Sequence, residues 1–291
     1  MDPKLTLTFL KPGLQTTIQD KGRLGYQYLG IPIGGALDQK SAKMANFLVS
    51  NDKNEPVFEI TLTGPEILFD SDALIAITGA NFEVYSDGVL IDNNKAHYLT
   101  SGSIISFGKL KAGSRAYLAV AGKWNVQKWK NSASPLLQSP EATADSFIKK
   151  GSKISIDSHY LNKTESWDKN KTPPVLSTKI RVRVKPGPDF ENISRMTIAE
   201  FFSQGHIISS DSNRMGYRLE SKLAKAEERD ELISSGIIPG TIQLTQSGQA
   251  IILLNDAQTT GGYPRIANIE EDDLDSVAQL KPGDEIWFSL V

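Results

Sequence analysis

The sequence predicts a mainly β protein of two domains with few helices. The chain has 291 residues, about twice the roughly 150 residues of a typical domain. Short segments rich in β-branched residues recur along it, separated by Gly, Asn-Asp and Pro-Gly turns. Hydrophobic residues make up 39% and charged residues 23%, a composition typical of globular rather than disordered chains. Many short strands with few helices are characteristic of β-barrels or β-sandwiches.

The helices that we expect are short and are marked by their caps. Asp38 is placed to cap a helix that runs to about Val49. A second helix follows a capping-box pattern at 197–200, and a third covers 273–280. The predicted strands are 57–62, 74–78, 82–85, 104–107, 115–120, 179–184, 242–245, 250–254 and 285–290.

The sharpest change in composition lies at residues 157–179. This segment contains Pro173-Pro174 and many Asn, Lys, Ser and Thr residues, with few large apolar side chains. Such a composition is typical of an inter-domain linker. We therefore expect an N-terminal β-barrel domain at 1–156, a linker at 157–179 and a C-terminal β-barrel domain at 180–291.

Charge and composition exclude several classes of protein. The 32 basic and 34 acidic residues give a net charge of −2, so there is no basic surplus for binding nucleic acid or anionic lipid. The absence of cysteine excludes disulfides, thiol nucleophiles and thiolate-bound metals. No apolar run is long enough to span a bilayer. No secretory signal is visible, so we expect a cytoplasmic protein.

The common catalytic and nucleotide-binding signatures are missing from the sequence. His97, His159 and His206 are scattered singly, which favours surface or core roles over metal ligation. The acidic run at 270–275 suggests either a cation site or the start of a helix. At a helix start, negative side chains interact favourably with the positive end of the helix dipole. We favour the helix start, and we expect no metal in this chain.

One polar segment, at 258–265, combines the groups needed to bind a small anion or amide. Its two glycines either form a nest of backbone N–H groups or the turn of a glycine hairpin, and the residues alone leave both open. The side chains supply an amide, hydroxyls, a forked cation and an aromatic face. The predicted substrate-binding residues here are Gln258, Thr259, Thr260, Gly261, Gly262, Tyr263 and Arg265.

A second polar, glycine-rich segment lies at 15–38 and has a weak echo in the other half of the chain. Asp-x-x-Arg-x-Gly-Tyr occurs at 20–26 and again at 211–217. The repeat is either a coincidence among turn residues or the mark of two related barrels whose equivalent loops meet at a shared polar cleft. The predicted binding residues of the first segment are Gln15, Gln19 and Arg23. Arg214 is a candidate partner for an anionic group of the substrate. Either Asp211 or Asp38 is the candidate general base.

The motifs taken together resemble the allophanate hydrolase subunit 2 family, which includes biotin-dependent carboxyltransferase domains, as in urea amidolyase, and the C-type subunit of bacterial 5-oxoprolinase. The longest is Leu-Lys-Pro-Gly-Leu-Gln-Thr-Thr-Ile-Gln-Asp-Lys-Gly-Arg-Leu-Gly-Tyr-Gln at 10–27. The resemblance covers about 8–122 and 180–290. The other matching segments are 30–32, 35–38, 45–49, 59–62, 64–65, 78–80, 116–122, 210–216 and 258–264.

The resemblance implies two cyclophilin-like β-barrels and a separate partner, a subunit 1 homologue. It implies a subunit of an ATP-dependent amide or lactam hydrolase, or of a carboxyltransferase in which biotin carries the carboxyl group, active only in the complex. ATP is then used at the level of the complex, and the substrate is a small amide or lactam. The alternative is a non-catalytic regulator that binds a subunit 1 or kinase-inhibitor type of partner.

One segment departs from the family pattern. Where the family has a second glycine and a Gly-Ser-Arg-Ser-Thr loop, this chain has no glycine between Gly122 and Gly151. Ser132 and Ser134 stand for the two serines, and the loop arginine is either replaced by Ala133 or lost. Lysine does not replace the forked contact of an arginine.

Overall fold

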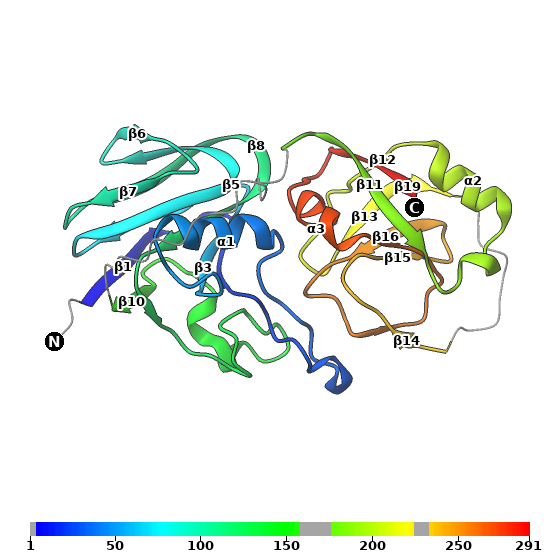
Figure 1. Cartoon of the computed structure of the whole chain (residues 1–291), viewed down its shortest axis with the longest axis horizontal. Coiled ribbons are helices and arrows are strands. Elements are labelled where there is room, and N and C mark those ends of the chain that lie inside the picture. The colour runs from blue at the N-terminus through cyan, green and yellow to red at the C-terminus, as the bar shows by residue number, and fades with distance from the viewer. Residues whose placement is uncertain (1–3, 158–175, 224–232) are drawn as a thin grey trace. The chain divides into compact units, whose positions relative to one another are not determined.

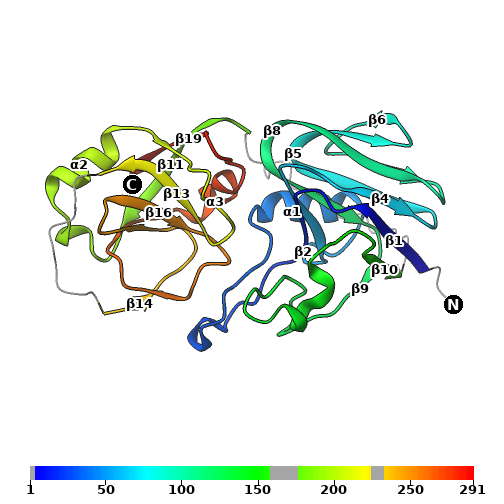
Figure 2. The same ribbon diagram turned by 180° about the vertical axis from the view of Figure 1, so that it is seen from behind.

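The computed structural model describes residues 4–157, 176–223 and 233–291. The chain divides into two compact units, one of Met1–Arg23 and Gly34–Leu176, the other of Leu24–Ile33 and Ser177–Val291. Of the described residues, 44% lie in strands and 15% in helices, with one sheet forming a half-barrel and another a nearly closed barrel (Figures 1 and 2). The expected fold class, mainly β with two barrel-like sheets and a few short helices, is confirmed. Most of the predicted linker, residues 158–175, lies outside the described residues.

The first unit is built on a ten-stranded sheet. Its main path runs β2-β3-β8-β4-β1-β10-β9, and β5 pairs with β6, β7 and β8. The strands are β1 (Lys4–Lys11), β2 (Gln15–Gln19), β3 (Val57–Thr61), β4 (Glu66–Phe69), β5 (Ala73–Ser86), β6 (Val89–Ile91), β7 (Ala96–Leu99), β8 (Ile104–Val120), β9 (Lys123–Asn125) and β10 (Lys153–Asp157).

Two of these strands are longer than the sequence suggested. The predicted strands 74–78 and 82–85 are parts of β5, and 104–107 and 115–120 are parts of β8. Gly79 and Gly113 lie inside these strands with φ of 80° and 77°. The register between β5 and β8 also shifts in this region. Glycines that looked like strand ends therefore allow bulges within continuous strands.

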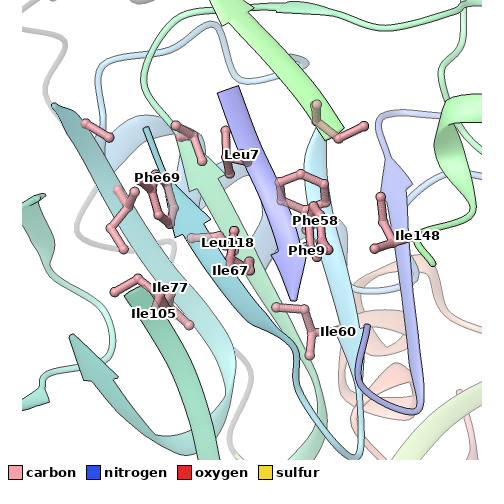
Figure 3. Packing of buried hydrophobic residues seen from close by; sticks show 14 of the residues in the cluster. Leu7, Phe9, Phe58, Ile60, Ile67, Phe69, Ile77, Ile105, Leu118 and Ile148 are labelled. Atoms are coloured by element: carbon pink, nitrogen blue, oxygen red, sulfur yellow. The ribbon is translucent and has the colours of Figure 1, made fainter. Parts of the chain in front are cut away.

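Alternation along the strands builds the core of this unit. On β1, Leu5, Leu7 and Phe9 are fully buried, while the residues between them are partly exposed. Phe9 packs edge-on against Phe58 of β3, with ring centres 5.0 Å apart. Figure 3 shows these side chains between the strands. Full burial of one such aliphatic or aromatic side chain contributes about 1.5–3 kcal/mol.

The helix of the first unit, α1 (Gln39–Leu48), begins where Asp38 predicted it. Its buried face carries Ala42 and Ala45, which pack in one cluster with Ala76 and Ala119 of the sheet. Small side chains on both surfaces let the helix lie close to the strands. A short 3-10 helix covers Pro140–Ser146 within the loop between β9 and β10.

The second unit is built on a seven-stranded sheet in the order β12-β19-β11-β18-β15-β16-β13. β11 and β19 run parallel, and the other neighbours are antiparallel. The strands are β11 (Lys179–Pro186), β12 (His206–Ile207), β13 (Gly216–Lys222), β15 (Thr241–Leu244), β16 (Gln249–Leu253), β18 (Arg265–Ile269) and β19 (Glu285–Leu290). β14 (Ser235–Gly236) and β17 (Thr260–Gly261) form a separate small sheet.

The helices of this unit are displaced slightly from their predicted positions. α2 (Arg195–Ser203) is capped by Ser194, whose side chain accepts from the Thr197 N–H, so the cap lies three residues before the predicted one. α3 (Glu271–Ala278) begins two residues early, with its acidic residues in the first turn. Arg183 pairs with Asp273 at 2.8 Å. The acidic run is therefore a helix start, as favoured. Short 3-10 helices also cover Gln27–Leu29 and Phe190–Asn192.

Candidate functional site

The first unit places the predicted binding residues Gln15 and Gln19 on β2. Both side chains point to the same face because they are four residues apart on one strand. Gln15 is exposed, whereas Gln19 is fully buried and donates to the Thr17 hydroxyl at 2.9 Å. The Gln19 Oε1 atom is buried without a hydrogen-bond partner among the described residues. An orphaned buried acceptor is destabilising, so a donor reaching this atom would be bound favourably.

Next to Gln19 the same face of the sheet carries a buried polar ladder. Thr17, Glu59 and Tyr117 are cross-strand neighbours on β2, β3 and β8. The Tyr117 hydroxyl donates to Glu59 Oε2 at 2.9 Å, and Arg115 Nε lies 3.7 Å from Glu59 Oε1. Burial, followed by the negative charge of Glu59, raises the pKa of Tyr117 well above its ordinary value. Tyr117 is therefore a neutral phenol, able to donate one hydrogen bond and accept others.

Asp38, a predicted general base, is engaged at the start of α1. Its Oδ1 accepts from the Ser41 N–H at 2.8 Å, and its Oδ2 accepts from the Ser41 hydroxyl at 2.5 Å. Its own N–H donates to Tyr117 at 2.8 Å, and its side chain is fully buried. A general base must reach the proton that it removes. In this conformation the helix start holds both carboxylate oxygens, so Asp38 is placed as a structural cap.

The divergent loop at 122–151 folds onto Asp20. The Asp20 Oδ1 atom accepts from the Ser132 and Ser134 hydroxyls at 2.7 and 2.8 Å, and Oδ2 accepts from the Ala133 N–H at 2.7 Å. Arg23 is buried and donates to the carbonyls of Ser134 and Pro135. The two serines of this loop therefore stabilise the turn that carries the first copy of the repeat.

In the second unit the equivalent arginine binds a carboxylate. Arg214 donates through Nε and one Nη atom to the two oxygens of Asp256, at 2.8 and 3.0 Å, and both residues are buried. The bidentate geometry fixes the guanidinium plane. Asp211 is exposed, and its N–H donates to the Ser209 hydroxyl at 3.3 Å. The two copies of the repeat thus differ, since Asp20 is buried and Asp211 is accessible to solvent.

Gly261 lies in a strand, and Gly262 follows it. Gly261 pairs with Ser235 across β14 and β17, and neither glycine has a positive φ. A Cβ atom on Gly261 would lie 2.5 Å from Gln243 Nε2. The nest is not formed, because it requires alternating backbone handedness, and Gly261 lies within a paired strand rather than in the turn of a hairpin. Gly261 is needed here because the buried Gln243 side chain packs directly against it.

Arg265 and Tyr263 lie on either side of the next turn. The Arg265 Nε atom donates to Asp189 at 2.9 Å, and an Nη atom donates to the Gly236 carbonyl at 3.2 Å. Burial disfavours ionised Asp189, but the hydrogen bonds from Arg265 outweigh it and keep the pKa of Asp189 below its usual value. The Tyr263 ring is 45% exposed, so its aromatic face is open to contact.

Gln258 and Thr259 line a small pocket of the second unit. The pocket also includes Asn255, and its apolar walls come from Ile237, Ile238, Pro239, Leu254 and Ala257 together with Pro32 and Ile33. None of the described residues lining it is charged. The enclosed space is about 10 Å³, enough for about one water molecule. With Gln27, which also lines the pocket, the structure brings three carboxamides and a hydroxyl together against an apolar surface.

Several residues of these clusters were missed by sequence reasoning. Four residues that hold or adjoin the polar side chains singled out from the sequence are Glu59, Tyr117, Asp189 and Asp256. Asp256 was visible only as part of a turn after a strand. Nothing local to these residues distinguishes a buried acid from a surface acid, because their partners are distant in sequence.

The chain matches a known domain family along most of its length. A family model described as "Carboxyltransferase domain, subdomain A and B" matches residues 29–290. The chain belongs to this carboxyltransferase domain family. Its resemblance to urea amidolyase and to the C-type subunit of 5-oxoprolinase is confirmed. Within the residues described, no helix is both long and apolar enough to cross a membrane, and no group of three or more His, Asp or Glu side chains is arranged to hold a metal ion.

Three relatives illustrate the range of the family. The chain is 37% identical to the C-type subunit of 5-oxoprolinase from Escherichia coli, over 97% of this chain and 90% of the relative. It is 33% identical to urea amidolyase of Saccharomyces cerevisiae, over 95% of this chain but 16% of that protein. A crystal structure of Kluyveromyces lactis urea carboxylase superposes with a TM-score of 0.88 at 27% identity, over 100% of this chain and 28% of that one.

Proposed function

We propose that this protein is the C-type subunit of a 5-oxoprolinase complex, an amide-processing subunit that works with a separate subunit 1 homologue. The observation that carries the proposal is the pocket at Asn255, Gln258 and Thr259, which presents uncharged hydrogen-bonding groups against apolar walls. The 37% identity to such a subunit along almost the whole length of both chains supports it.

The chemistry of the pocket suits a neutral amide or lactam. A carboxamide side chain offers both a donor and an acceptor, so Asn255 and Gln258 can pair with the C=O and N–H of a substrate amide. Ligand sites typically combine apolar walls with a few such orienting groups. The enclosed space is far smaller than a lactam, so the proposal requires the pocket walls to open when substrate binds.

Charge for an anionic group comes from Arg214 and from Arg265, each already oriented by a carboxylate. Asp256 holds the guanidinium of Arg214, and Asp189 holds that of Arg265. We propose Asp211 as the general base because it is exposed, whereas Asp38 is buried at a helix start. Thr260 and Tyr263 would complete the binding loop beside Gln258.

We assign ATP use to the partner subunit. Gly261 lies in β17 and neither Gly261 nor Gly262 has a positive φ, so the pair does not form the nest of N–H groups that cradles phosphate. The family resemblance also allows biotin as a carboxyl carrier at the level of the complex. No step of the proposed role of this chain depends on either cofactor.

The test is to purify the chain and its subunit 1 homologue separately and together, then measure ATP hydrolysis with and without 5-oxoproline. We expect little activity from the isolated chain and 5-oxoproline-dependent turnover from the assembly. Gln258→Ala should raise KM for 5-oxoproline, whereas Gln204→Ala, at the end of α2 and outside the pocket, should leave it unchanged.

Two results would overturn the proposal. Robust turnover by the isolated chain would show that it does not depend on a partner. An assembly that forms tightly but never hydrolyses ATP would favour the non-catalytic regulator.

A further inference from the structure

A larger cavity opens in the first unit, within the strands that surround β5. Its volume is about 360 Å³, within the range of small-molecule sites. Its lining comes from Gly79 and residues 81–83 of β5, residues 90–94 around the end of β6, Lys111 of β8 and Leu176. None of the residues predicted for the amide site lines it.

Irregular strand pairing creates this cavity. Between Gly79 and Val84 the register of β5 against β8 shifts three times. Such bulges bend strands, interrupt the hydrogen-bond ladder and redirect side chains, and they occur preferentially beside functional sites. The pairing of the two long strands is therefore irregular where Asn81, Phe82 and Glu83 line the cavity.

Opposite charges face the same space. Lys111 Nζ lies 3.3 Å from Glu83 Oε1, with side chains 50% and 30% exposed. An ion pair this exposed and long contributes little stability, so either partner can exchange for a group of a ligand. Asp92 adds a second carboxylate to the lining, and its own pair with Lys95, at 2.7 Å, is likewise exposed and exchangeable. The described lining thus offers one ammonium and two carboxylates.

A polar wall of two asparagines lies beside these charges. Asn93 Nδ2 donates to the Phe82 carbonyl at 2.8 Å and to Asn81 Oδ1 at 3.3 Å. Both partners are acceptors, which fixes the orientation of the Asn93 amide. Its Oδ1 atom is buried and has no hydrogen-bond partner in the described part of the chain. Buried acceptors in native structures are usually hydrogen-bonded. A ligand that brings a hydrogen-bond donor would satisfy this atom.

The remaining lining is aliphatic and aromatic. Phe82, Leu90, Ile91 and Leu176 form the apolar part, and Leu90 is 59% exposed. Exposed aliphatic surface beside paired charges suits a molecule with an apolar side chain and a zwitterionic head.

We propose that this cavity is a second binding site, which takes a free amino acid with an aliphatic side chain. The carboxylate of the ligand pairs with Lys111, its ammonium group lies between Glu83 and Asp92, and its side chain packs on Leu90 and Ile91. The site is independent of the proposed amide pocket, because the two share no residue.

The test uses the isolated full chain and titration calorimetry with leucine, 4-methylpentanoate, which lacks the amine, and isoamylamine, which lacks the carboxylate. We expect saturable binding of leucine only. Lys111→Met should weaken it by about tenfold or more. Lys11→Met removes a comparable exposed ion pair, Lys11–Glu66, and should change the affinity by less than about twofold.

A second measurement protects the test against a folding defect in the variant. In the unaltered chain, leucine should shift the NMR signals of the Asn93 side-chain amide. The proposal fails if no aliphatic amino acid binds saturably below about 10 mM, if Lys111→Met binds leucine normally, or if the Asn93 signals do not move. None of these results bears on ATP hydrolysis by the assembled complex, so each proposal fails on its own data.

Discussion

Breaking the Arg214–Asp256 pair should strongly destabilise the second unit. The two side chains are 5% and 7% exposed, and both guanidinium–carboxylate hydrogen bonds are close to ideal length. Asp256→Asn removes the charge and leaves Arg214 buried without its counter-ion. Removing one partner of a buried ion pair costs about 3–5 kcal/mol. Only a small discount for solvent screening applies, because both groups are more than nine-tenths buried.

The magnitude translates into a large thermal shift. For a unit of about 125 residues, each kcal/mol lowers Tm by roughly 3–5 °C, so the variant should unfold at least about 10 °C earlier. Denaturant unfolding followed by circular dichroism measures the same change. The matched control is Glu270→Gln, which breaks the exposed Lys185–Glu270 pair in the same unit and should cost less than about 1 kcal/mol.

A double variant separates the interaction from the cost of an unpaired charge. Arg214→Met with Asp256→Leu replaces both groups by apolar ones and should recover much of the lost stability, because no buried charge remains. The reasoning is refuted if Asp256→Asn unfolds together with the Glu270→Gln control. It is also refuted if the double variant is as unstable as the single one.

Three further results are expected from the structure. Gly261→Ala places a methyl group against the Gln243 side chain and should lower the free energy of unfolding by about 1–3 kcal/mol. The control is Gly236→Ala in the paired strand, where the added methyl group meets open space. Equal effects of the two variants in chemical denaturation would contradict this prediction. Tyr117→Phe removes a hydroxyl that bridges a buried carboxylate and a backbone N–H, and should lower the free energy of unfolding by about 1–3 kcal/mol; an unchanged unfolding curve would refute the ladder. Burial lowers the pKa of His206, so as pH falls the unfolded chain is protonated at this histidine before the folded chain. The free energy of unfolding should therefore fall as pH drops below about 6.5. His206→Gln should flatten the dependence of stability on pH between pH 5 and 7, and an unchanged dependence in this variant would assign it to other groups.

Local signals in the sequence predicted the character of the fold well. β-Branched runs and turn residues indicated a mainly β chain, and the cap at Asp38 predicted the start of α1. The polar segment at 258–265 was singled out from its residue types, and two of its residues line a pocket. These features depend on neighbouring residues, whose preferences act at short range. The family motifs are also formed by neighbouring residues, so they could be recognised from the sequence alone.

The electrostatic role of each acid was decided only by the tertiary structure. Asp20 meets Ser132 across 112 residues, and Arg214 meets Asp256 across 42. The repeat gave Asp20 and Asp211 the same context, yet one is buried beneath the divergent loop and the other is exposed. Burial and pairing depend on which distant segments pack together, and that packing sets whether a carboxylate stabilises a turn or remains accessible to a substrate.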